Sequence, residues 1–163
     1  MKCQLKKMVA LLLLIAVFIG SSSFVKHEPK APPPGNSQIA FINYTLQQVI
    51  VDIIIKDGGG TAAATLYRWT YSVPAWGVQY TPAIPHDCTI GVWSPYLYIQ
   101  WRVATPLNNG SHRFTDPNGQ PIFGSPDGCK GLGSSATKGG TGNPFGYGCG
   151  QYTYELYGSS GCL

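Results

Sequence analysis

Residues 96–104, with the sequence YLYIQWRVA, alternate between two kinds of side chain. The apolar set is Leu97, Ile99, Trp101 and Val103. The amphipathic and polar set is Tyr96, Tyr98, Gln100 and Arg102. Successive side chains of a β-strand point to opposite faces, so the pattern predicts a strand with one face in a core and the other at a surface.

The same alternation continues on both sides of this segment. Residues 48–56 (QVIVDIIIK) are apolar on both faces, which favours a central strand, and residues 65–73 place Tyr67, Trp69, Tyr71 and Val73 on one face. Further strands are expected at residues 39–45, 77–81, 88–93, 112–115, 120–123 and 151–157. Gly, Pro and Asn turns separate these segments. The prediction is an all-β fold, an antiparallel β-sandwich of Ig-like or jelly-roll-like type, with a small barrel as the alternative.

The first 23 residues have the features of a secretory signal peptide. Three lysines precede the apolar run VALLLLIAVFI at residues 9–19, and small residues follow it. The run is shorter than the roughly 20 residues that a spanning helix needs, so we expect removal of the leader and no membrane span after it; retention as an anchor stays open. Residues 24–38 are rich in proline and predict a linker or disordered segment, followed by one β domain at residues 39–163.

Charge and composition exclude several classes of protein. The chain of 163 residues has a net charge of +4, but without the leader eight basic and seven acidic residues remain. No run of basic residues is left, so no nucleic-acid partner is expected. With only 11% charged residues, a charge-rich disordered tail and a coiled coil are also excluded.

Four cysteines follow the leader: Cys88, Cys129, Cys149 and Cys162. An even number in an exported chain indicates two disulfides and a secreted or cell-surface location, with three possible pairings. We favour Cys129–Cys149 with Cys88–Cys162, because the first would close the segment 128–150. That segment holds nine glycines in 23 residues and predicts one long surface loop.

Two short stretches carry a resemblance to known proteins. Residues 41–45 (FINYT), an alternating strand, a glycine turn, residues 73–75 (VPA) and a later cysteine resemble small exported bacterial β-sandwich proteins of uncharacterised function. The resemblance covers residues 39–105. It implies the fold and an exported protein, and it transfers no catalytic residue.

Few side chains are candidates for chemistry. His86, Asp87 and His112 could form an acid–base site of a small secreted hydrolase or toxin, but no nucleophile motif accompanies them. Asp116 and Asp127 lack the closing glutamate of a calcium loop. We therefore predict no catalytic residue, no metal site and no cofactor.

The most plausible binding face is formed by Tyr96, Tyr98, Gln100 and Arg102. Aromatic rings can stack on sugars or on partner side chains, and Arg and Gln give directional hydrogen bonds. Strand propensity alone also accounts for the two tyrosines. The sequence thus predicts an exported, non-enzymatic interaction or structural module with a glycan or a protein surface as partner. The alternatives are a carbohydrate-binding module on this face and the hydrolase or toxin.

Overall fold

The structure is a computed structural model that describes residues 35–59, 62–92, 95–105, 107, 110–123, 130–131, 137–142 and 144–158. The predicted leader therefore lies outside the described residues, as does most of the proline-rich segment. The first strand begins at Asn36, so the last residues of the predicted linker already belong to the sheet. In this part of the chain no helix is long and apolar enough to cross a membrane.

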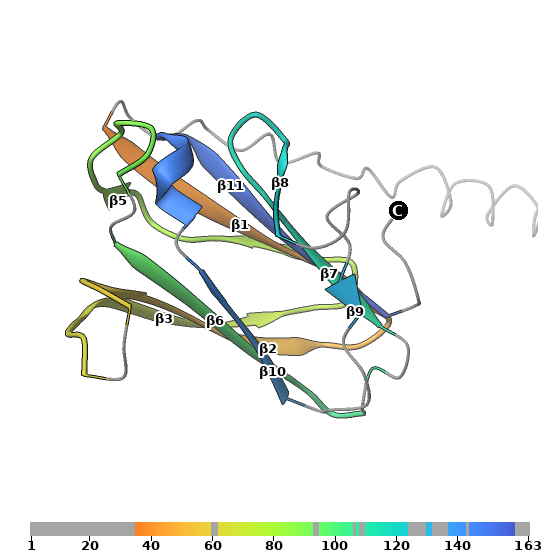
Figure 1. The fold of residues 1–163 in the computed structure, drawn as a ribbon. Coiled ribbons are helices and arrows are strands. Elements are labelled where there is room, and N and C mark those ends of the chain that lie inside the picture. Colours follow the sequence, from red (N-terminus) through yellow and green to blue (C-terminus); the bar gives the residue numbers. More distant parts are fainter. Residues whose placement is uncertain are drawn as a thin grey trace, which may run out of the picture. The chain divides into compact units, whose positions relative to one another are not determined.

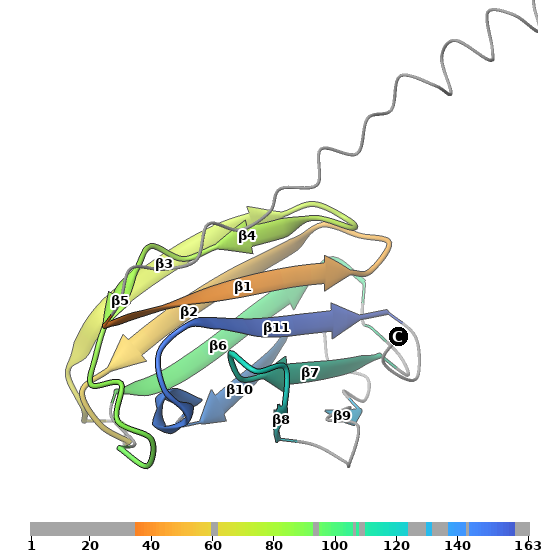
Figure 2. The same ribbon diagram turned by 90° about the horizontal axis from the view of Figure 1, so that it is seen from above.

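Two sheets pack face to face as an all-β sandwich (Figures 1 and 2). The larger sheet has the order β4 (Val78–Tyr80), β1 (Asn36–Tyr44), β11 (Gln151–Tyr157), β7 (Ser111–Thr115) and β8 (Pro121–Phe123), with β5 (Ile84–Pro85) on β1 and β9 (Lys130–Gly131) on β7. The smaller sheet has the order β10 (Thr137–Gly142), β6 (Tyr96–Val103), β2 (Val49–Lys56) and β3 (Thr65–Val73). Neither sheet closes on itself, so the sandwich is confirmed and the alternative of a barrel is wrong.

Strand β1 pairs with β11 in parallel, whereas the other strand pairs of the described chain are antiparallel. The register joins Gln38 to Gln151 at one end and Tyr44 to Tyr157 at the other. Two strands more than a hundred residues apart in the chain thus form the middle of the larger sheet (Figure 2).

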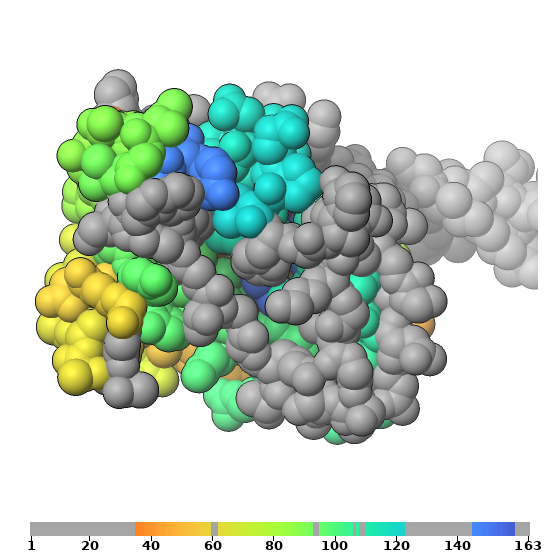
Figure 3. Space-filling model, in the orientation of Figure 1, coloured from red at the N-terminus to blue at the C-terminus, as the bar shows by residue number. Residues whose placement is uncertain are grey.

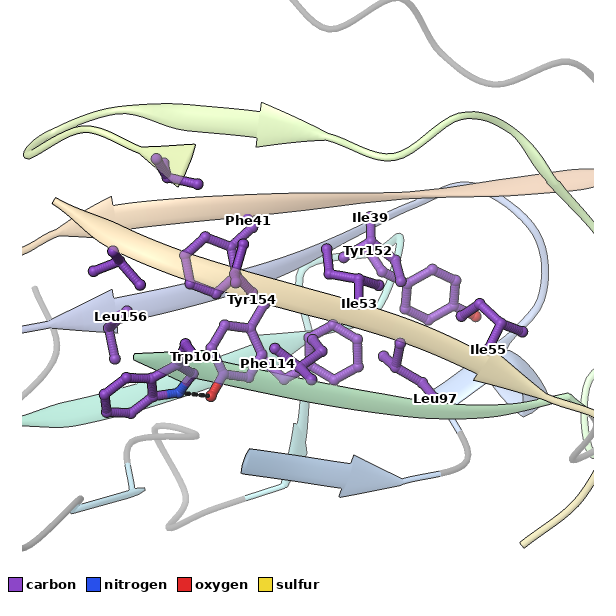
Figure 4. Close-up of a cluster of buried hydrophobic side chains, with 14 of the residues drawn as sticks. Ile39, Phe41, Ile53, Ile55, Leu97, Trp101, Phe114, Tyr152, Tyr154 and Leu156 are labelled. Carbon is purple, nitrogen blue, oxygen red and sulfur yellow. Dashed lines mark hydrogen bonds between the residues drawn. The ribbon is translucent and has the colours of Figure 1, made fainter. Parts of the chain in front are cut away.

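The core lies between the inward faces of the two sheets (Figure 4). Strand β2 is central, as its pattern predicts: Val51, Ile53 and Ile55 are fully buried, while Ile50 on the opposite face is exposed. The larger sheet contributes mainly aromatic rings: Phe41, Phe114, Tyr152 and Tyr154. The alternation of residues 96–104 is confirmed too, because its apolar set is buried.

Two sequence predictions about local structure are wrong. Residues 88–92 form a turn instead of a strand, with Val92 N–H donating to the Thr89 carbonyl and Gly91 N–H donating to the Gly146 carbonyl. The segment 128–150 is not one loop, because it contains β9, β10 and the 3-10 helix η1 (Pro144–Tyr147). β10 satisfies the backbone groups on the outer side of β6, which would otherwise be a free edge.

The favoured cysteine pairing is also wrong. Cys88 is bonded to Cys149, with their Cα atoms 4.9 Å apart. The segment after β5 lies beside η1 at one end of the sandwich (Figures 1 and 3), which places Cys88 next to the chain that enters β11. Cys129 and Cys162 lie outside the described residues.

Candidate binding site

The predicted binding face is on the outer surface of the smaller sheet. Gln100 and Arg102 are exposed, but Tyr96 and Tyr98 are half-buried. The two rings are tilted against each other with centroids 6.2 Å apart, and the Lys56 ammonium lies 5.1 Å from the centre of the Tyr98 ring. The structure therefore brings the four residues into one row and covers part of its aromatic surface with their neighbours.

Contacts with neighbouring segments reduce the free surface of these four residues. Gly59 lies so close to the Tyr96 ring that a Cβ atom there would be 2.5 Å from it. Asp52 lies on the adjacent strand β2. It accepts from Thr70 Oγ1 of β3 at 2.5 Å, and Arg68 of β3 lies 3.8 Å from the same carboxylate. Much of this face is thus engaged in contacts within the sheet, so it offers less free surface than its sequence suggests.

His86 belongs to the disulfide end of the sandwich. Its Nδ1 lies 2.7 Å from the Asp87 carbonyl, so Nδ1 carries the proton and Nε2 accepts from Ser37 Oγ at 2.6 Å. Burial lowers the His86 pKa, against smaller opposing effects of Asp87, which favours this neutral form. Ser37 is fully buried, so the pair fastens the loop to β1 and does not present a nucleophile to solvent.

His112 lies toward the other end of the larger sheet. It is buried on β7, and its Nδ1 is hydrogen-bonded to Tyr154 Oη at 2.6 Å, while the same oxygen accepts from Trp101 Nε1 at 3.2 Å. On β11, Leu156 pairs with His112, and Gln151 pairs with Gln38, the neighbour of Ser37. The two levels are five residues apart along β11. At about 3.3 Å per residue, the two histidines are separated by on the order of 16 Å. The candidates for acid–base chemistry do not share one cleft.

A tryptophan that sequence reasoning missed stands out at the turn between β3 and β4. The N–H of Gly77 donates to the Pro74 carbonyl at 3.0 Å and closes a four-residue turn. Trp76 is its third residue, with φ at 58° and 61% of its surface exposed. Positive φ at this position normally requires glycine or asparagine, and a bulky residue there stores backbone strain of about 1–3 kcal/mol.

The strained turn is held by one buried side chain, Asn43 of β1. Its Nδ2 lies within hydrogen-bond distance of the carbonyls of Gln47 (2.9 Å), Val73 (3.2 Å) and Pro74 (2.9 Å). Its Oδ1 accepts from the backbone N–H and the hydroxyl of Thr45, at 3.0 and 2.7 Å. Asn43 therefore ties the β1–β2 turn to the β3–β4 turn.

These two turns, together with residues that follow β6 and β11, line a pocket of about 500 Å³. Its lining is Tyr44, Leu46, Gln47, Trp76, Thr105, Leu107 and Gly158. Leu46 is 87% exposed, and Trp76 meets Tyr44 edge-on with centroids 6.1 Å apart. The site therefore has an apolar rim that faces solvent, and the described residues of its lining include no charged side chain.

Two further contacts fix the pocket in shape. The Gln47 amide holds the backbone of Thr105 at both ends, donating from Nε2 at 2.8 Å and accepting at Oε1 at 3.0 Å. The Tyr44 ring stacks on Tyr157 with centroids 5.0 Å apart. Burial, with a smaller contribution from Glu155, raises the Tyr44 pKa, so its phenol is neutral. The lining of the pocket is therefore held in place by contacts within the protein.

The sequence carries only a partial signal for this site. The motifs FINYT and VPA, which carry the family resemblance, are the segments that hold Asn43, Tyr44 and the start of the Trp76 turn. They were interpretable as strand and turn patterns alone. Nothing in them reports the positive φ of Trp76 or the exposure of Leu46. Comparisons with protein families, curated proteins and solved structures find no match to this chain.

Proposed function

We propose that this protein is an exported, non-enzymatic interaction module that binds an uncharged apolar side chain of a partner protein in the Trp76 pocket. The observation that carries the proposal is the exposed, strained Trp76, fixed by the Asn43 network beside Leu46. Strain of this kind persists only where the surrounding structure enforces it, and it concentrates at functional positions.

The lining favours an apolar side chain over a sugar. A sugar site needs several free polar groups that meet hydroxyls, whereas the amide of Gln47 is already bonded at both ends to Thr105. Leu46 and Leu107 add aliphatic surface next to the two rings. An aliphatic or aromatic side chain would bury this surface and leave no polar group of its own unpaired.

Export rests on other features. The leader pattern of residues 1–23 supports it, and the Cys88–Cys149 bond is compatible with an extracellular location. The separation of His86 from His112 weighs against the hydrolase or toxin alternative. The carbohydrate alternative on Tyr96 and Tyr98 is less favoured, because both rings have close neighbours within the sheet.

The test uses model ligands and the indole N–H signal of Trp76 in a ¹⁵N–¹H NMR spectrum. The Trp76→Phe variant assigns the signal. N-acetyl-leucinamide and N-acetyl-phenylalaninamide at millimolar concentration are expected to shift it, and methyl β-glucopyranoside is not. Leu46→Ser should abolish the shift, whereas Ile90→Ser, which changes an exposed apolar residue elsewhere, should retain it.

Two results would overturn the proposal. A shift with the glucoside but not with the amides would assign the pocket to a sugar. No shift with any of the three probes would remove the pocket as a binding site.

A further inference from the structure

Among the described residues, the outer strand of the smaller sheet, β3, has no strand partner on the edge away from β2, and the carbonyl of its last residue, Val73, accepts from Asn43. In the described part of the chain it pairs with β2 alone, and its side chains from Thr65 to Arg68 are exposed. Figure 2 shows β3 along the outside of the sandwich, next to the short strand β4 of the other sheet. The backbone N–H and C=O groups of alternate residues point to this outer edge and are a template for another strand.

The strand has few of the features with which proteins usually protect such an edge, and Arg68 is its one charged residue. It has no proline and no lysine, and its one register shift lies at the β2 residues Ile55/Lys56, near the first residue of β3. Leu66 is 49% and Tyr67 37% exposed, and Tyr67 stacks on the half-buried Trp69 with centroids 5.5 Å apart. The edge therefore combines free hydrogen-bonding groups with apolar surface.

We propose that β3 pairs antiparallel with β3 of a second copy of this chain, with the two-fold axis at Trp69. Paired residues must share a face of the sheet, so the axis passes through a residue position. An axis at Arg68 would oppose the two arginines. An axis at Thr70 would bring Pro74, which has no N–H, into the ladder. The Trp69 axis pairs all nine residues and places Tyr67 opposite Tyr71 of the second copy.

Charge complementarity supports this register. Arg68 would lie opposite Thr70 of the second copy, whose hydroxyl is bonded to Asp52 of the adjacent strand. The Arg68 side chain is 60% exposed, and its guanidinium is only loosely paired with its own Asp52, at 3.8 Å. Each Arg68 could therefore reach Asp52 of the other copy. The two-fold axis would make this ion pair twice in the dimer.

The test measures self-association of the intact protein by sedimentation velocity, with circular dichroism as a check of folding. A concentration-dependent dimer is expected. Tyr67→Lys should raise its dissociation constant by at least about tenfold, because the charge enters the interface twice. Ile90→Lys, on exposed surface away from β3, should leave it unchanged.

Cysteine cross-linking tests the register on the outer face of the strand. Arg68→Cys mixed with Thr70→Cys should give a covalent dimer under mild oxidation, well above either variant alone or the unmodified protein. A monomer at all concentrations would overturn the proposal. A covalent dimer from Thr70→Cys alone would overturn the Trp69 axis. Neither result affects the Trp76 pocket, whose test is independent.

Discussion

The two ends of strand β1 are held in different ways. Near Ser37, the Cys88–Cys149 bond and the His86 hydrogen bond fasten a packed end in which η1 covers the core. Near Asn43, one buried amide holds two turns by hydrogen bonds, and those turns present exposed apolar side chains. The comparison indicates that the covalent bond stabilises the closed end, while the hydrogen bonds shape the open end, which we propose as the binding site.

The largest expected effect on the free energy of unfolding comes from the disulfide, and it should leave the other end of β1 unchanged. Cys88→Ala with Cys149→Ala opens a cross-link that spans 61 residues. Loop-closure entropy predicts a loss of about 4 kcal/mol in the free energy of unfolding, measured by urea denaturation. The Trp76 indole signal should stay in place, since the pocket lies at the other end. An unchanged free energy, or a displaced indole signal, would contradict the assignment of roles.

An intermediate effect is expected at the open end. Asn43→Ala leaves buried carbonyls without a donor and should lower the free energy of unfolding by about 2 kcal/mol, and it should also displace the Trp76 signal. Asn43→Asp keeps the acceptor for Thr45 but turns an oxygen toward three carbonyls. It should therefore be no more stable than Asn43→Ala. Thr45→Ser, which retains the hydroxyl, is the mild control. An Asp variant as stable as the parent would refute the donor role.

The smallest effect concerns the strain at Trp76. Trp76→Gly should be about 1 kcal/mol more stable than Trp76→Ala, because both lose the ring but only glycine adopts the positive φ freely. Thermal unfolding of the two variants gives the difference. Equal stability would mean that the turn stores no strain.

Much of the fold was predictable because the sheets impose a period of two on the sequence. The buried sets of β2 and β6 follow directly from alternation, and the same pattern predicts β3 with its observed bounds, Thr65–Val73. The pairing of cysteines was not predictable, because it depends on which loops meet. Local composition favoured Cys129–Cys149, whereas the fold brings the segment after β5 to the start of β11.

The candidate site was harder to predict than the fold. The row of Tyr96 and Tyr98 is visible in the alternation, but its contacts with Lys56 and Gly59 come from neighbouring segments. The Trp76 pocket depends on a dihedral angle and on an asparagine 33 positions earlier in the chain. Neither property is encoded by a local pattern, because both arise when two turns distant in sequence meet.

The parallel pairing of β1 with β11 has a consequence for how the protein reaches its native state. The middle of the larger sheet requires residues 36–44 and residues 151–157 at the same time. Contacts of such high sequence separation slow folding, since a long loop must close before they contribute. Synthesis of the N-terminal strands alone cannot complete this sheet. The middle of the larger sheet therefore forms only after nearly the whole domain has been made, and until then β1 lacks its parallel partner.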